Sequence, residues 1–225
     1  MMERRRDAGM AVVIVLLALL LTSALGAALI LTTSSETIIA GNYLASIEAL
    51  YAADGAAERA IAELGGVADW NAVLGGSVRS VFVDGPPGGS RTMPDGSAID
   101  LGEFVNLANC GEVRLCSGAE MDAATARRPW GANNPRWQLY AYGLLRDTTS
   151  AATIDSSYYV IVLVGDDPAE NDGNPVQDGA GTGNPGAGVI AVRAEARGPR
   201  GARRVVELTV GRQAGPRLLS WREIR

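Results

Sequence analysis

Histidine and lysine are both absent from this chain of 225 residues, so its 20 basic residues are all arginine. Without histidine there is no serine–histidine–aspartate triad and no histidine ligand for a metal. Without lysine the chain cannot form a phosphate-binding P-loop, which requires one. Nothing marks a pair of carboxylates for glycoside chemistry either. We therefore expect a protein that is not an enzyme.

Cysteine is scarce as well, with only Cys110 and Cys116 present. Outside the cytoplasm such a pair indicates one disulfide that closes a short loop, and two free thiols are the alternative. The charge balance is mildly acidic, with 25 acidic residues, 20 basic residues and a net charge of −5. Because nucleic acid attracts basic surfaces, this balance argues against nucleic acid as a partner.

One long uncharged run is present, from Met10 to Leu31, and it follows the arginines at positions 4–6. As a helix, its 22 residues would span about 33 Å. The hydrocarbon core of a bilayer is about 30 Å thick, so the run is long enough to cross it. The preceding arginines favour an N-terminus in the cytoplasm and a C-terminus outside.

Three interpretations of this run are open. A secretory signal peptide would be cut at a small-residue site such as residues 24–26, although residues 27–31 stay apolar beyond it. A signal anchor would remain in the membrane uncut. A prepilin-type leader would be short and basic and would be cut between Gly9 and Met10.

The helical pattern continues without proline to Gly65-Gly66 and becomes amphipathic after residue 31. Apolar residues recur at helical spacing on one face, with Leu44 and Tyr51 beside it: Tyr43, Ile47, Leu50, Ala57, Ile61 and Leu64. We expect this face to pack on the rest of the protein. Asp54 and Glu58 fall inside the stripe. They either lie at its edge and reach water or meet arginines of this domain or of a neighbouring subunit.

Residues 67–225 are enough for one soluble domain with a sizeable core. The pattern predicts strands at residues 77–84, 138–145 and 157–164, and a helix at residues 101–108 that Asp100 can cap. A hairpin is predicted at Val189–Arg197 and Ala202–Val210, on either side of a Gly-Pro-Arg-Gly turn. Residues 218–221 would add a last strand or pack on the sheet. The expected fold class is α+β, with the long helix packed on an antiparallel sheet.

The loop from Gly165 to Gly188 is dense in oxygen ligands. Calcium prefers six to eight such oxygens on a flexible loop. The candidate ligands are Asp166, Asp167, Asn171, Asp172 and Asp178. The alternating spacing of an EF-hand is absent, and the glycine and proline content equally fits a solvated loop that holds no ion.

The N-terminal third of the chain resembles the PilX-like minor pilins of type IV pili. The matching segments are AGMAVVIVLLALLLTSALGAALIL at residues 8–31, ETIIAGNY at residues 36–43 and YAADGAAERAIAEL at residues 51–64. This third is also similar to the largest minor pseudopilin of type II secretion. The segment Val192 to Arg212 looks like the closing hairpin of such proteins.

This resemblance implies a pilin-like fold and a fixed course of processing. A prepilin peptidase would remove residues 1–9 as a leader and methylate the new amine of Met10. Residues 10–31 would be the transmembrane half of the helix, residues 32–64 its amphipathic half, and residues 67–225 an extracytoplasmic headgroup. The subunit would stand in the inner membrane and then join other pilin subunits through its N-terminal helix, in a pilus or at the cell surface. Because the pseudopilin class has calcium-binding members, the resemblance also keeps the calcium candidates open.

The resemblance also bears on position in a filament. In most type IV pilins the fifth mature residue is a glutamate, understood to neutralise the N-terminal amine of an adjacent subunit. That place holds Ile14 here, and no carboxylate appears between Met10 and Glu36. An unpaired charge at the bilayer centre costs about 2.5–3.5 kcal/mol. A subunit that cannot neutralise a neighbour therefore suits the end of a filament, where that neighbour is missing.

The expected function is thus a minor pilin-like subunit that primes or caps assembly of a type IV pilus, with adhesion as a further role. Two alternatives stay open. One is a type II secretion minor pseudopilin. The other is a membrane-anchored extracytoplasmic binding domain that is unrelated to filaments.

Processing at Gly9–Met10 gives the first testable prediction. Co-expression with a prepilin peptidase should shorten the chain by the nine residues of the leader and leave an N-methylated Met10. Intact-mass measurement reports both changes, and cells without the peptidase are the control. A mature N-terminus near Ala27 would instead establish ordinary signal-peptide cleavage.

Overall fold

The computed structural model describes residues 4–127, 136–148, 155–179, 183–212 and 215–224. Its elements are α1 (Arg4–Leu64), α2 (Trp70–Leu74), β1 (Ser90–Thr92), β2 (Ala98–Asp100), α3 (Leu101–Asn109), α4 (Gly118–Arg127), β3 (Gln138–Leu144), β4 (Tyr159–Asp166), β5 (Val189–Arg197), β6 (Arg203–Gly211) and β7 (Arg217–Ile224). The chain divides into two compact units, residues 1–44 and residues 45–225.

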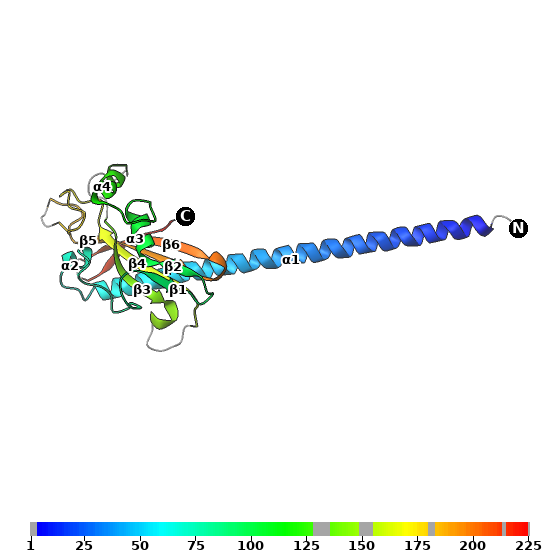
Figure 1. The fold of residues 1–225 in the computed structure, drawn as a ribbon, viewed down its shortest axis with the longest axis horizontal. Coiled ribbons are helices and arrows are strands. Elements are labelled where there is room, and N and C mark those ends of the chain that lie inside the picture. The colour runs from blue at the N-terminus through cyan, green and yellow to red at the C-terminus, as the bar shows by residue number, and fades with distance from the viewer. Residues whose placement is uncertain (1–3, 128–135, 149–154, 180–182, 213–214, 225) are drawn as a thin grey trace. The chain divides into compact units, whose positions relative to one another are not determined.

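The first unit contains the N-terminal part of α1, which is helical from Arg4 onward and therefore includes part of the expected leader (Figure 1). The large apolar side chains between Met10 and Leu31 are exposed. Among the described residues, α1 is the one helix that is long and apolar enough to cross a membrane. Its threonine hydroxyls donate to carbonyls three or four residues earlier, at Thr22, Thr32, Thr33 and Thr37.

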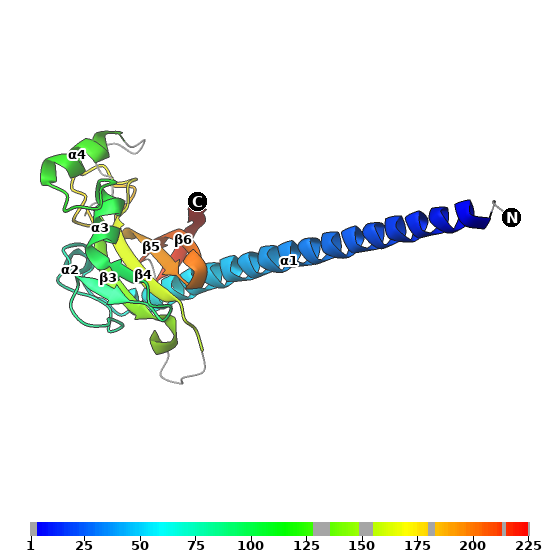
Figure 2. The ribbon, with the colours of Figure 1, turned by 45° about the vertical axis from the view of Figure 1, so that its right-hand side comes forward.

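The second unit is built on a five-stranded antiparallel sheet with the order β3-β4-β5-β6-β7. Each strand pairs with its neighbour in the sequence, as Figures 1 and 2 allow the reader to follow. The predicted hairpin is confirmed as β5 and β6, and residues 218–221 do add a last strand, β7. In the hairpin turn Arg200 and Gly201 have positive φ angles of 59° and 74°. Glycine adopts such a backbone at no steric cost, whereas arginine does so rarely.

The face of α1 that packs on the sheet consists almost entirely of alanine. The buried helix residues are Ala45, Ala49, Ala52, Ala53, Ala56, Ala57, Ala60 and Leu64. They meet the inward side chains of four strands, including Val160 and Val162 of β4, Val192 and Ala194 of β5, and Val206 and Leu208 of β6. Methyl side chains let the helix backbone approach the sheet closely, so this contact is dense although its side chains are small.

The expected helix face is confirmed at Ala57 and Leu64, which are buried, but it is wrong for Tyr43 and for the two residues placed beside it. Tyr43 is 69% exposed, Tyr51 is 71% exposed and Leu44 is 58% exposed, and only Leu50 and Ile61 pack partly against the core. The error has a simple cause. The alanines recur at the same spacing of three and four residues as the large residues, so periodicity alone does not show which of two adjacent faces is buried.

Polar contacts fix both ends of the packed part of α1. At its start, the hydroxyl of Tyr158 donates to the carbonyl of Ala45 at 2.8 Å and to the carboxylate of Glu48 at 3.2 Å. At its end, the indole N–H of Trp70 donates to the carbonyl of Leu64 at 3.1 Å. The same carbonyl also accepts from the N–H of Val67 at 3.2 Å, so the last turn of the helix is held by both a backbone and a side-chain donor.

The acidic residues of the helix stripe lie at its edge. Asp54 is half-buried and accepts a hydrogen bond from the indole of Trp221 on β7 at 2.8 Å, so it meets a tryptophan and not an arginine. Glu58 is exposed. One turn further along, Arg59 pairs with Glu63 at 3.2 Å, as the spacing of four residues predicts.

The second face of the sheet is covered in part by α3, which runs beside β3 and β4 (Figure 2). Phe104 and Leu101 of the helix pack against Ile161 and Leu163 of β4. The predicted cap is confirmed, because the side chain of Asp100 accepts from the N–H groups of residues 102 and 103 at 2.8 and 3.3 Å. Among the described residues, no helix covers this second face of the sheet at β6 and β7.

The strand predicted at residues 77–84 does not form. This segment runs along the outer edge of β3 and makes a single parallel bridge, between Val83 and Tyr142. The N–H of Ser80 donates to the carbonyl of Tyr140 at 3.1 Å. The N–H of Asp84 likewise donates to the carbonyl of Tyr142 at 3.1 Å, so the segment covers the edge of β3 without completing a ladder.

The alanine interface predicts an asymmetric response to larger side chains. Ala53→Leu should lower the free energy of unfolding by about 1–3 kcal/mol, because extra methylene groups have no room in a packed core. Ala62→Leu is the matched control on the same helix, since Ala62 is exposed, and should change it by less than about 0.5 kcal/mol. Denaturant unfolding followed by tryptophan fluorescence measures both variants. Equal effects of the two substitutions would contradict the buried alanine face.

Candidate functional site

The residues proposed for processing lie within α1. Gly9 and Met10 are helical and exposed, and no heavy atom of another element lies near the position of a Cβ on Gly9. Ile14 is also exposed, at 60%. Cleavage and methylation at this junction stay a prediction.

The expected disulfide joins Cys110 to Cys116, with their Cα atoms 6.2 Å apart. Cys110 is the C-cap of α3, so the bridge links the end of that helix to the segment that leads into α4. The short loop between the cysteines presents Val113 and Leu115 to solvent, with exposed fractions of 59% and 82%. The bridge therefore holds two apolar side chains on the surface.

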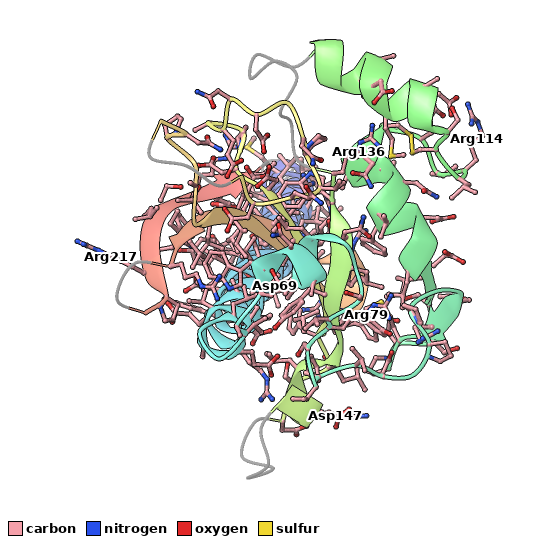
Figure 3. The ribbon with its side chains drawn as sticks, turned by 90° about the vertical axis from the view of Figure 1, so that its left-hand side faces the viewer. Asp69, Arg79, Arg114, Arg136, Asp147 and Arg217 are labelled. Carbon is pink, nitrogen blue, oxygen red and sulfur yellow. A yellow bond between two sulfur atoms is a disulfide. The ribbon has the colours of Figure 1, made fainter. Side chains whose placement is uncertain are left out.

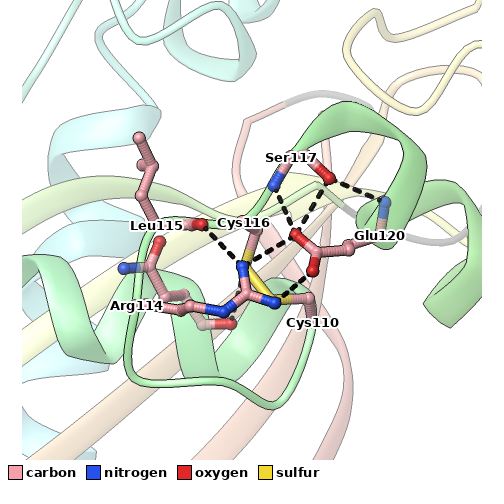
Figure 4. A network of polar contacts seen from close by, with 7 residues as sticks. Cys110, Arg114, Leu115, Cys116, Ser117 and Glu120 are labelled. Atoms are coloured by element: carbon pink, nitrogen blue, oxygen red, sulfur yellow. Dashed lines mark hydrogen bonds and ion pairs between the residues drawn. A yellow bond between two sulfur atoms is a disulfide. The ribbon is translucent and has the colours of Figure 1, made fainter.

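A polar network fixes the far side of this loop, as Figure 4 shows. Glu120 of α4 accepts from the N–H and the hydroxyl of Ser117 at 2.8 and 2.9 Å and forms an ion pair with Arg114. These bonds, with the one from Arg114 first, lower the pKa of Glu120 to about 2. Arg114 comes from inside the disulfide loop, so the loop and α4 are joined by both a covalent bond and a charge pair.

The second cluster of interest is acidic and lies where β4 ends. Asp166, Asp167 and Glu170 are all buried, with exposed fractions of 0%, 8% and 5%. The carboxylate oxygens of Asp166, Glu170 and Asp172 lie within 4.8 Å of one another. Buried carboxylates are uncommon, so this group is the part of the predicted calcium loop that differs most from a solvated surface.

The loop closes tightly over Glu170. Its carboxylate accepts from the N–H of Gly179 at 2.9 Å and from the side-chain amide of Asn184 at 2.9 Å. A Cβ on Gly179 would clash with that carboxylate, and a Cβ on Gly186 would clash with the Glu170 side chain. Glycine is therefore required at both positions for the loop to fold against the acid.

Only part of the predicted ligand set comes together. Asp178 accepts from the N–H of Gly188 at 2.6 Å, and Asp167 accepts from the N–H of Ala169 at 3.1 Å, so both close turns of the loop. Asn171 uses its amide to donate to the carbonyl of residue 183 at 3.4 Å. Asp166 and Asp172 do approach each other.

The third carboxylate of that group, Glu170, was missed by the sequence reasoning. Its presence in the same acidic run was the only signal that could have marked it. With one oxygen from each residue, the three carboxylates supply three of the six to eight oxygens that calcium prefers. The residues thus fit half of a calcium shell, and calcium binding stays a prediction.

Burial has an electrostatic consequence in this loop. It raises the pKa of Asp167, against the hydrogen bond from Ala169, which lowers it. Burial also raises the pKa of Glu170, and the negative charges of Asp172 and Asp178 add to that rise. The arrangement therefore makes the ionised forms of these carboxylates costly.

Comparison of this chain with models of protein families, with curated proteins and with solved structures finds no match. Its function is therefore argued from its own residues.

The raised pKa of Asp167 predicts a stability gain that depends on pH. A carboxyl whose pKa is raised on folding destabilises the folded state once it ionises, and this cost vanishes below its unfolded pKa. Asp167→Asn keeps an acceptor for Ala169 and removes the charge, so it should raise the melting temperature at pH 7 and have no effect below about pH 3.8.

The matched control for this experiment is Asp95→Asn. Hydrogen bonds from Ser97 lower the pKa of the exposed Asp95, so its ionised form is favoured in the folded state and the substitution should give no gain at pH 7. Thermal melts at both pH values compare the two variants. A lower melting temperature for Asp167→Asn at pH 7 would contradict the prediction and would point to a cation that uses this carboxylate.

Proposed function

We propose that this chain is a minor subunit of a type IV pilus or a related filament, where it starts or caps assembly. The observation that carries the proposal is that the two parts of α1 have different surroundings. Its N-terminal part exposes a continuous apolar surface long enough to cross a membrane. Residues 45–64 of the same unbroken helix pack on an antiparallel sheet. A subunit that leaves a bilayer to join a helical core would need both properties.

The exposed part of α1 needs a partner in any final state of the protein. Apolar side chains over this length are stable only in lipid or against other apolar helices. Gly26 and Gly41 have open space at the positions of their missing Cβ atoms, so a second helix could approach closely there. Packing among N-terminal helices in a filament core would satisfy this requirement outside the membrane.

The position in the filament follows from Ile14. After cleavage behind Gly9, the new amine of Met10 would be a charge in an apolar core, and Ile14 offers no carboxylate to a neighbour's amine. The subunit can still place its own amine beside another subunit's glutamate. The lack of a carboxylate at position 14 has no cost only where no neighbouring amine needs one. That place is one end of the filament.

Two features bear on the related alternatives. The disulfide-held loop that exposes Val113 and Leu115 would suit contact with a surface, which supports adhesion as an added role. The acidic group of Asp166, Glu170 and Asp172 would suit the pseudopilin of type II secretion, because that class has calcium-binding members. The helix and the sheet favour neither alternative over the other.

Gold labelling of a tagged headgroup tests the position. We expect wild-type label at one end of filaments, with few copies on each. Ile14→Glu restores a carboxylate that can pair with a neighbour's amine, so its label should spread along the shaft. Ile14→Gln is the control, because it is polar and of similar size but uncharged, and its label should stay at the end. Wild-type label along the shaft at many copies would overturn the proposal.

A further inference from the structure

An arginine on the outer face of the sheet, Arg193, has no ion-pair partner in the described part of the chain. Arg193 lies on β5 between Val192 and Ala194, which point to the opposite face and pack against α1. Among the residues that the structure describes, none forms a hydrogen bond or an ion pair with its guanidinium, which only faces Glu207 and Glu195 at longer range. A half-buried arginine with five unused N–H donors is unusual.

Glu195, the nearest carboxylate on the same strand, is already neutralised. It is only 6% exposed. Arg197 donates to it at 2.6 Å, and Arg203 of β6 donates to both of its oxygens at 2.7 and 3.0 Å. Two arginines thus share one glutamate through three hydrogen bonds, none of which comes from Arg193.

The cross-strand neighbour also pairs with another arginine, although through a single hydrogen bond. Glu207 of β6 stands opposite Arg193 in the register, but it forms an ion pair with Arg222 of β7. The whole cluster therefore sets four arginines against two glutamates. It carries an excess of two positive charges on a chain whose net charge is −5.

Arg193 cannot relieve this excess by losing its proton. Burial lowers the pKa of its guanidinium most, the negative charges of Glu207 and Glu195 raise it, and the positive charges of Arg203 and Arg222 lower it again. An arginine nevertheless stays charged in proteins because its ordinary pKa is above 12. A desolvated cation without an anion is stabilised by any ligand that supplies the missing charge.

A small pocket opens beside this guanidinium, between α3 and strands β4 to β6. Its volume is about 30 Å³. The apolar wall is made by Phe104, Leu107, Ala108, Ile161 and Leu163, and Arg193, Glu195, Arg197 and Arg203 form the rest. Arg197 is fixed over the ring of Phe104, with its guanidinium 5.2 Å from the ring centre.

We propose that this pocket binds one carboxylate, presented by an acidic side chain of a protein partner, and that Arg193 is its ion-pair partner. The pocket is too small for a cofactor, and the planar fork of a guanidinium matches the two oxygens of a carboxylate. The apolar wall suits the methylene groups that carry such a carboxylate. Leu107 at the rim is 46% exposed and offers further apolar contact to the partner. This inference does not depend on the filament.

The test uses the full chain in detergent, with its arginines labelled with ¹⁵N so that the Nε–H signals can be followed. The probes are the blocked tripeptide acetyl-Ala-Glu-Ala-amide, its glutamine analogue and inorganic phosphate, all at constant ionic strength and pH 7. We expect the glutamate peptide to shift the signal of Arg193 saturably. The glutamine peptide should leave this signal unchanged, and phosphate should bind at least tenfold more weakly.

Variants assign the site. Arg193→Gln should weaken binding of the glutamate peptide at least tenfold, as reported by the signals of Arg197 and Arg203. Arg193→Lys keeps the charge without the fork and should weaken it by a smaller factor. Arg79→Gln is the control and should bind like the wild type, because Arg79, which Figure 3 labels, is exposed and does not line the pocket.

Any of four results would overturn the inference. They are no saturable shift with the glutamate peptide, an equal shift with its glutamine analogue, tighter binding of phosphate, and undiminished binding by both Arg193 variants. Far-UV circular dichroism checks that each variant is folded. If Arg193→Gln does not fold, Arg193→Lys alone decides the assignment.

Discussion

Close approach of α1 to the sheet is the constraint on which the rest of this domain depends. A helix and a sheet bury most surface per residue when nothing bulky separates their backbones, and the alanines from Ala45 to Ala60 meet that condition. The strands supply the volume instead, through the β-branched residues of β4, β5 and β6. Each layer is thus complementary to the other, and a larger residue on the helix would push the layers apart at every neighbouring contact.

Local signals in the sequence predicted a large part of this fold. Several features depend only on residues that are a few positions apart in the sequence. They are the Asp100 cap, the hairpin of β5 and β6, the end of α1 before Gly65 and the disulfide. The interactions that form these features are local ones: helix capping, turn formation and closure of the disulfide loop. They can be recognised without knowing what else the segment touches.

The features that were missed depend on partners far along the chain. Residues 77–84 have strand-like composition, but they form only one bridge to β3 and not a full ladder. The shape of the sheet decides which face of α1 is buried. The helical spacing of apolar residues carries no information about that shape. Glu170 joins the acidic group only because residues 179–186 fold back over it. Arg193 could not be singled out either, since its lack of an acceptor results from how Arg203 and Arg222 are paired.

The way α1 is fastened has a mechanical consequence. The sheet is joined to residues 4–44 through this one helix, so tension on those residues reaches the sheet along residues 45–64. To slide along the sheet, the helix would have to break its whole row of alanine contacts at once. The hydrogen bond from the hydroxyl of Tyr158 to the first buried carbonyl would be loaded first. A row that yields all at once resists force better than one that peels residue by residue. The same small side chains that make the contact dense would let this domain withstand traction applied through its stem.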